Sequence, residues 1–163
     1  MNGPGEYVSD VTEGITRVED LPKPRIERHS RNWSERPCPR CHHGAGRYSV
    51  GHRTLHDLGD ARANRPIDLL VTFSRHRCLR CRRCFTCDLS DLALPNCLYT
   101  RRLQQRAVRL VAEDGLPYRN ASWHLWRDHR VFVPYATIQN WVEAAGKKNP
   151  DHVVGSLPRQ GAG

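Results

Sequence analysis

The sequence Cys78-Leu79-Arg80-Cys81-Arg82-Arg83-Cys84-Phe85-Thr86-Cys87 places four of the chain's seven cysteines at successive spacings of three residues. A matching pair, Cys38-Pro39-Arg40-Cys41, lies upstream. A CxxC turn directs two sulfur atoms to adjacent corners of a tetrahedron, and zinc favours soft, anionic thiolate ligands. The two segments therefore predict the two halves of one zinc ribbon with a structural Zn²⁺ ion.

The downstream half of this site is ambiguous, because Cys78/Cys81, Cys81/Cys84 and Cys84/Cys87 all have the required spacing. We favour the first pair, since it directly follows a predicted strand. The predicted metal ligands are Cys38, Cys41, Cys78 and Cys81.

An alternative stays open for the remaining cysteines. A second ion would be held by Cys84, Cys87, Cys97 and a histidine such as His76. His42, His43 and His52 are interpreted as surface residues rather than ligands.

The chain is basic, with 26 Lys and Arg residues against 17 Asp and Glu, a formal charge of +9 and a pI near 9.6. Residues 1–27 hold six acidic residues against three basic ones, so the remainder carries about +12. Such a field attracts a polyanion. We expect double-stranded DNA as the partner, with a solubilising basic surface as the alternative.

The sequence contains neither an apolar run of the roughly 18 residues that a membrane helix needs nor the apolar stretch of a signal peptide. We therefore expect a soluble protein without membrane partners, located in the cytoplasm and associated with the nucleoid. In a reducing compartment the cysteines favour metal ligation over disulfides.

The first part of the folded chain reads as a small antiparallel β structure. Residues 1–36 carry Gly and Pro without apolar periodicity, which predicts a disordered leader. The zinc ribbon is expected at residues 37–92, with short strands around Arg47–Val50 and Arg53–Leu58 and a turn over Gly59–Pro66. Alternating apolar residues from Ile67 onward predict a further strand that leads into the second cysteine pair.

After Pro95 the periodicity becomes helical, which predicts an α+β protein overall. Three helices are expected, after Thr100 to about Asp114, from Tyr118 to about Asp128, and from Pro134 to Ala145. Together they predict a helix-turn-helix domain at residues 98–146, followed by a flexible tail at 147–163. The expected inward residues are Leu103, Ala107, Leu110, Val111, Ala121, Leu125, Trp126, Ile138, Trp141, Val142 and Ala145.

In a helix-turn-helix domain the third helix enters the major groove with its N-terminal end. The candidate readers of base edges are Tyr135, Thr137, Gln139 and Asn140. The candidate phosphate contacts are Arg101, Arg102, Arg106, Lys147 and Lys148. The alternative is a three-helix bundle with a solvated polar face, and Trp123, Trp126 and Trp141 are interpreted as core residues.

The order of these features resembles the N-terminal region of bacterial insertion-sequence transposases. Cys38-x-x-Cys41, the segment His52-Arg53-Thr54-Leu55-His56-Asp57-Leu58-Gly59, and the run from Arg75 to Phe85 are similar to the zinc-ribbon head of that family. Tyr135-Ala136-Thr137-Ile138-Gln139-Asn140-Trp141-Val142 looks like its helix-turn-helix signature. The resemblance covers about residues 37–146.

The resemblance implies recognition of the terminal inverted repeats of a mobile element. In that family a following RNase H-like domain cuts and joins DNA with an acidic triad and Mg²⁺. Cys38, Cys41, Cys78 and Cys81 match the family's metal ligands, whereas Cys84 stands where the family usually has Thr. Because 17 residues follow Gly146, we expect no catalytic domain and a separate transposase catalytic chain as a partner in transposition.

The leading hypothesis is therefore sequence-specific DNA binding at transposon ends without catalysis. The alternatives are a transcriptional regulator and a zinc-stabilised adaptor that binds an acidic protein. An enzyme is the weakest reading, because four thiolates around one ion leave no open coordination position for water.

Overall fold

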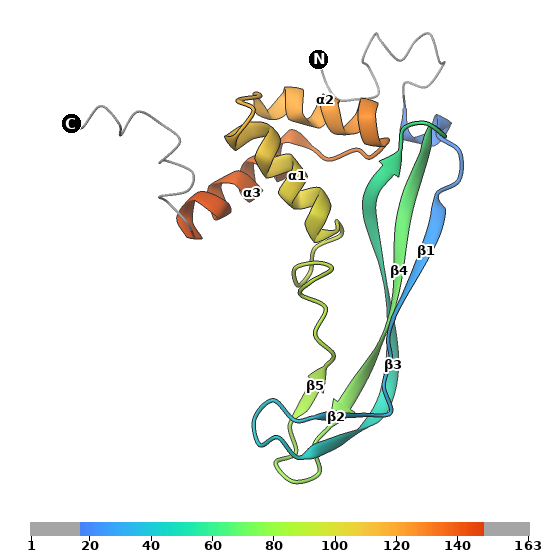
Figure 1. Cartoon of the computed structure of the whole chain (residues 1–163), viewed down its shortest axis with the longest axis vertical. Helices are drawn as coiled ribbons and strands as arrows, with labels where there is room; N and C mark the ends of the chain where they lie inside the picture. Colours follow the sequence, from blue (N-terminus) through green and yellow to red (C-terminus); the bar gives the residue numbers. More distant parts are fainter. Residues whose placement is uncertain (1–16, 149–163) are drawn as a thin grey trace, which may run out of the picture. The chain divides into compact units, whose positions relative to one another are not determined.

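The computed structural model describes residues 17–148, which form an α+β chain (Figure 1). Contacts divide the described residues into two compact units. The cysteine unit comprises residues 25–56 and 68–101, and the helical unit comprises residues 17–24, 57–67 and 102–148.

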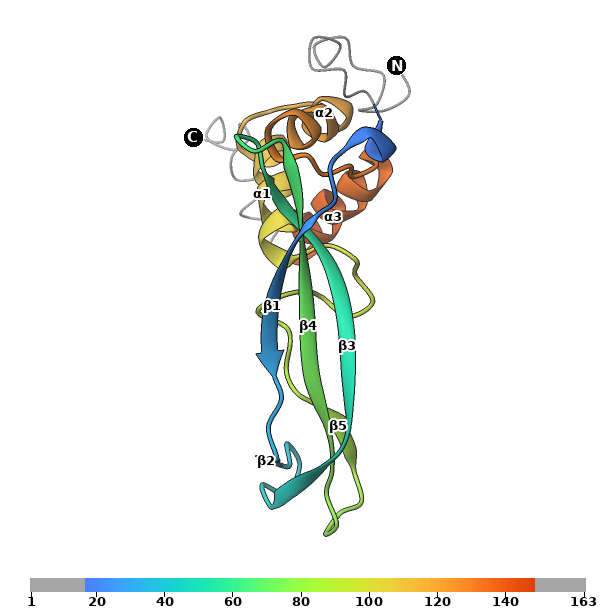
Figure 2. The ribbon, with the colours of Figure 1, turned by 90° about the vertical axis from the view of Figure 1, so that its right-hand side faces the viewer.

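One sheet has the strand order β1-β4-β3-β2, with β5 also paired to β4 (Figure 2). Its strands are β1 (Arg25–Arg31), β2 (Glu35–Pro37), β3 (Gly44–Asp60), β4 (Arg65–Arg77) and β5 (Cys84–Thr86). The short strands β2 and β5 pair antiparallel with β3 and β4, respectively.

Strand β3 is continuous, whereas the sequence predicted two short strands in the same region. Gly51, between the two predicted strands, faces the ring of Phe73, and a Cβ atom at this position would lie 2.6 Å from the ring's Cζ atom. The glycine is thus explained by close packing rather than by a break in the strand.

The turn between β3 and β4 is also shorter than predicted. Asp60 accepts hydrogen bonds from the backbone N–H groups of Arg62 and Ala63, at 2.9 and 3.3 Å, and Asn64 adopts a φ of 54°. These are the local bonds and the left-handed conformation that Asp and Asn favour in turns.

The prediction of a disordered leader over residues 1–36 is wrong for residues 25–36. Strand β1 pairs with β4, and the chain then crosses to β2 on the other edge of the sheet. The hydroxyl of Ser74 on β4 holds the crossing segment in place by accepting from the Trp33 N–H at 3.2 Å. Residues 1–16 lie outside the described residues.

Two apolar clusters form the core of the cysteine unit. In the first, segment 89–93 covers the buried face of β3 and β4. Its members are Leu55, Leu69, Val71, Ala93, Leu89 and Leu92. Arg53 donates to the carbonyl oxygens of Leu94 and Cys97, at 2.7 and 2.5 Å, so hydrogen bonds also hold the chain that directly follows this segment. The second cluster surrounds Cys38 and Cys78.

The three predicted helices are present, as α1 (Arg101–Ala112), α2 (Tyr118–His129) and α3 (Tyr135–Lys148). The buried residues of α1 recur at helical spacing, and α2 packs against α3. Helix α3 includes Lys147 and Lys148, where the sequence predicted the start of a flexible tail, and residues 149–163 lie outside the described residues. None of the helices described between residues 17 and 148 is long and apolar enough to cross a membrane.

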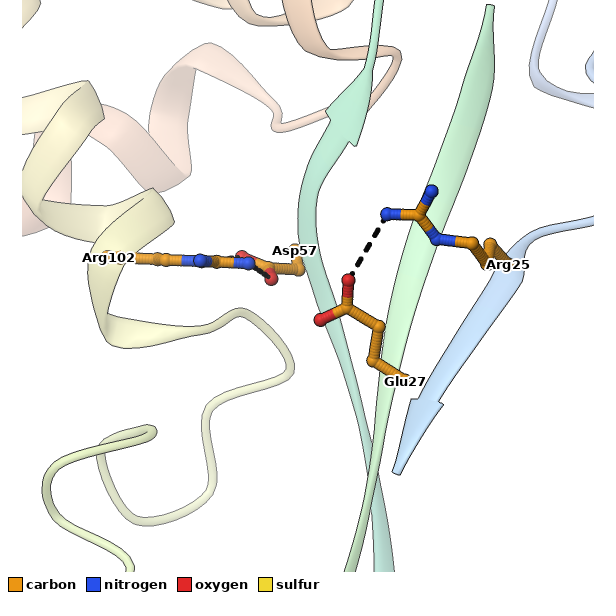
Figure 3. A network of polar contacts seen from close by, with 4 residues as sticks. All are labelled: Arg25, Glu27, Asp57 and Arg102. Carbon is orange, nitrogen blue, oxygen red and sulfur yellow. Dashed lines mark hydrogen bonds and ion pairs between the residues drawn. The ribbon is translucent and has the colours of Figure 1, made fainter. Parts of the chain in front are cut away.

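The turn of the β3–β4 hairpin belongs to the helical unit, which the predicted boundary between ribbon and helices did not anticipate. Arg102 of α1 donates two hydrogen bonds to the carboxylate of Asp57 (Figure 3). Arg130, buried after α2, donates to the side chain of Asn64. Within the cysteine unit, Figure 3 also shows Arg25 and Glu27 paired at 3.2 Å.

Gly59 provides a test of how tightly this hairpin turn packs. A Cβ atom at Gly59 would lie 2.2 Å from the carbonyl oxygen of His129 and 2.9 Å from that of Arg65, and both obstacles are backbone atoms. We expect Gly59→Ala to lower the free energy of unfolding by about 2 kcal/mol, as overpacking does. Chemical denaturation measures the change. Gly46→Ala is the control, since a Cβ at Gly46 meets nothing within 4 Å, and an equal loss in both variants would contradict this packing.

Candidate metal centre

Two similar turns carry the four clustered cysteines. In the first knuckle (residues 38–43) the Cys38 N–H donates to the His43 carbonyl at 2.8 Å, and in the second (residues 78–83) the Cys78 N–H donates to the Arg83 carbonyl at 2.9 Å. The residue after the second cysteine of each knuckle, His42 or Arg82, has a positive φ of 62° or 61°. The two knuckles therefore have the same local backbone plan.

The sulfur atoms of the two knuckles converge. Cys38 Sγ lies 3.5 Å from Cys81 Sγ, and Cys41 Sγ lies 3.4 Å from Cys78 Sγ. All four sulfurs lie within 4.8 Å of one another. A zinc–sulfur bond of roughly 2.3 Å implies sulfurs about 3.8 Å apart around a tetrahedral ion. The arrangement thus fits one metal ion, bound by the four residues that the sequence favoured.

The environment of the thiols favours the charged form at one position of each knuckle. The backbone N–H of Cys41 lowers the pKa of Cys38 to about 6, and that of Cys81 lowers the pKa of Cys78. The backbone N–H of Arg83 also acts to lower the pKa of Cys81, but burial and the thiols of the other three cysteines raise it to about 11. Four thiols this close cannot all ionise readily without a cation, so a metal ion would relieve their mutual repulsion.

A buried hydrogen-bond network lies beside the knuckles. His76 is fully buried, and its Nδ1 atom lies 3.0 Å from the carbonyl oxygen of Ala45. Because a carbonyl only accepts, Nδ1 carries the proton, and Nε2 then accepts from the Ser74 hydroxyl at 2.7 Å. Cys87 Sγ lies 2.9 Å from the same hydroxyl. The network joins β3 to β4, so His76 has a structural role here, whereas the sequence offered it as a candidate ligand of a second metal ion.

No second metal site is assembled among residues 17–148. The group of four cysteines is the one cluster of three or more potential ligands described there. Cys87 is engaged in the buried network, Cys84 is exposed and Cys97 is half-buried. His42, His43 and His52 are exposed, as expected.

The candidate base readers lie on α3. Tyr135 and Asn140 are exposed, whereas Thr137 and Gln139 are half-buried. The guanidinium of Arg119 lies over the Tyr135 ring at 4.8 Å, and the amide of Gln139 donates to the carboxylate of Glu143 at 3.0 Å.

The candidate phosphate contacts have different surroundings. Arg106 and Lys147 are exposed, and Arg101 donates to the Ser90 carbonyl at 3.0 Å. Arg102 is bonded to Asp57, so its guanidinium has a structural task. Lys148 is the last residue of α3.

Most of the net positive charge lies in the cysteine unit. The cysteine unit holds thirteen arginines against five acidic residues, whereas the described part of the helical unit holds twelve basic residues against eight acidic ones. The phosphate contacts predicted from the sequence all lie on the helices, and none of them belongs to the arginines around the cysteine pairs. Two segments around the cysteine pairs, 36–47 and 75–83, contain no acidic residue. Their basic character could therefore have been predicted from the sequence.

Comparison with known proteins yields no relative, because no family model matches the chain and neither the curated proteins nor the solved structures include a significant match.

Proposed function

We propose that this chain is a zinc-stabilised protein that binds double-stranded DNA sequence-specifically, with α3 as the reading helix. The observation that carries the proposal is the two-sided character of α3. Ile138 and Val142 are buried on one side, and the uncharged hydrogen-bonding side chain of Asn140 is exposed on another. A helix held in this way can enter a major groove without losing its own packing.

The packing of α2 and α3 supports this assignment. Five residues, 130–134, connect the two helices. Val131 and Val133 in this connection are buried, and the hydroxyl of Ser122 donates to the Val133 carbonyl at 2.6 Å. The connection is therefore fixed to α2, and its packing defines the direction in which α3 leaves.

The residues on α3 favour base recognition over purely electrostatic binding. Asn and Gln amides can form paired hydrogen bonds with adenine in the major groove. Asn140 is exposed, and Gln139 would exchange its exposed bond to Glu143 for a base edge. The net charge of +9 supplies the general attraction to DNA.

Zinc is the metal that the four sulfurs favour. A set of four thiolates without oxygen ligands is typical of structural zinc, and it leaves no position for a reactive water. The ion would stabilise a unit whose sheet has a small apolar core. We therefore assign the metal a structural task and the chain a binding function, at the ends of a mobile element as the resemblance to insertion-sequence transposases implies.

Selection of bound duplexes from a random pool, followed by binding measurements, tests the proposal. We expect one sequence to be enriched, and the double variant Gln139→Ala/Asn140→Ala to bind that sequence about 10- to 100-fold more weakly, which corresponds to roughly 1–3 kcal/mol. Binding to a random duplex should change little, because phosphate contacts remain.

Gln105→Ala, which removes an exposed amide from α1, is the matched control. Failure to enrich any sequence, or an equal loss in the control, would remove α3 as the reading helix. Enrichment of promoter sequences rather than element ends would instead support a transcriptional regulator.

A further inference from the structure

The two acid-free segments, residues 36–47 and 75–83, contain eight arginines. We call them the knuckle arginines. They are Arg36, Arg40, Arg47, Arg75, Arg77, Arg80, Arg82 and Arg83. Seven of them are exposed, and Arg75 is half-buried. None forms an ion pair with a carboxylate of the described chain.

The metal centre arranges some of these arginines in pairs. Arg40 and Arg80 occupy the same position in the two knuckles, each directly before the second cysteine. The sulfurs of Cys41 and Cys81 belong to the cluster that lies within 4.8 Å. Convergence on one ion therefore brings two exposed guanidinium-bearing residues onto the same end of the cysteine unit. The carboxylate of Glu35 lies beside Gly44 but forms no ion pair with a knuckle arginine, so like charges gather there, which is costly for a surface with no anionic partner.

Other knuckle arginines are held in place by their neighbours. The guanidinium of Arg36 lies 4.4 Å from the centre of the Trp33 ring, and that of Arg75 lies 5.2 Å from the Phe73 ring. Arg47 donates to the Asn32 side chain at 2.7 Å. Each contact restrains a long side chain, so less conformational entropy is lost when an anion binds. None of the three contacts neutralises the charge of the arginine.

We propose that the knuckle arginines form a second DNA-contact surface, which binds the phosphate backbone of a duplex without reading its sequence. Arginine forks match phosphate oxygens, and eight of them without an acidic residue suit a polyanion. We favour a duplex over an unpaired strand because arginines, which match phosphates, far outnumber the exposed aromatic rings of the cysteine unit on which unpaired bases stack, and these rings are Trp33 and Tyr48. This inference rests on the proposed DNA binding, but it does not depend on α3 as the reading helix.

The test compares two variants of the full-length, zinc-loaded protein that lose the same charge. Arg40→Ala/Arg80→Ala removes the equivalent pair from the knuckles, and Arg28→Ala/Arg62→Ala removes two exposed arginines from outside them. Binding to a random-sequence duplex is measured at several salt concentrations. We expect the knuckle variant to lose about tenfold or more in affinity and to flatten the slope of log K against log salt by about 1.8, since each phosphate contact contributes roughly 0.9.

Zinc content verifies that the knuckles are intact in both variants. Equal slopes in the knuckle variant and the wild type, or equal losses in the two variants, would overturn the proposal. Tighter binding to an unpaired strand, with the same dependence on Arg40 and Arg80, would overturn the duplex assignment. If the knuckle variant weakens binding but no sequence is enriched by selection, the knuckle surface stands and the reading function of α3 fails.

Discussion

Replacement of Cys38 or Cys78 by serine is expected to abolish metal binding and to unfold the cysteine unit. A serine hydroxyl does not ionise at neutral pH, so it cannot replace a thiolate ligand. Both cysteines are buried within the second apolar cluster, so either substitution also puts a polar hydroxyl among buried side chains. Structural zinc contributes on the order of 10 kcal/mol to the folding of small domains. The few apolar contacts of this cluster cannot supply a stabilisation of that size.

Elemental analysis and circular dichroism measure this effect. The expected result is a fall from one zinc ion per chain to none, with loss of β-sheet signal. Cys84→Ser is the matched control, because Cys84 lies in the same cysteine-rich stretch but is exposed and outside the ligand cluster. Equal zinc loss in Cys84→Ser would show that the ligand set has been assigned incorrectly. A Cys38→Ser protein that folds without metal would show that the ion is not needed for the fold.

Replacement of Arg102 by alanine is expected to destabilise the helical unit by about 3 kcal/mol, because it removes a hydrogen-bond donor from a buried carboxylate, although the Arg102 side chain itself is 60% exposed. The Asp57 side chain is 0% exposed, and the guanidinium of Arg102 donates to both of its carboxylate oxygens. Without Arg102 the Asp57 carboxylate stays buried and loses this bidentate cationic partner. Thermal unfolding of the helical unit measures the loss.

Arg109→Ala is the control on the same helix. Arg109 pairs with Glu113 at 3.0 Å on the exposed face of α1, where such a pair contributes about 0.3–0.5 kcal/mol. We expect Arg102→Ala, assayed below its unfolding temperature, to leave the salt dependence of DNA binding unchanged. A flatter salt slope with unchanged stability would instead support the original interpretation of Arg102 as a phosphate contact.

The helices were predictable because their signal is local. Leu103, Ala107 and Leu110 recur at the spacing of one helix face, and all three are buried. The cysteine cluster was predictable for a different reason. Metal ligation requires a CxxC spacing, and this spacing can be recognised in the sequence without knowing how the strands pair. Both predictions rest on constraints that act within a few residues.

Strand β1 was not predictable in the same way. It is an edge strand rich in arginine, and its burial alternates only between exposed and half-buried. Its pairing with β4 is set by backbone hydrogen bonds across the sheet, which leave little trace in side-chain polarity. The continuity of β3 was not predicted, because a glycine within a strand pattern can indicate a break. Only the structure shows that Gly51 makes room for the ring of Phe73.

The roles of individual charged residues depend on tertiary contacts as well. Arg102 and Arg106 look alike on α1, yet Arg102 is bonded to Asp57, 45 residues away in sequence. Likewise, the Ser74–His76 bond becomes visible only when strand alternation places both residues on one face. Periodicity can identify a face, but it cannot identify the partner that the face meets.

Cys38, Cys41, Cys78 and Cys81 are expected to bind one metal ion between the two knuckles. X-ray absorption at the zinc edge, on the purified full-length protein, tests it most directly. We expect one zinc per chain with four sulfur neighbours at roughly 2.3 Å. A nitrogen or oxygen neighbour in place of sulfur, or protein that folds with no bound metal, would contradict it.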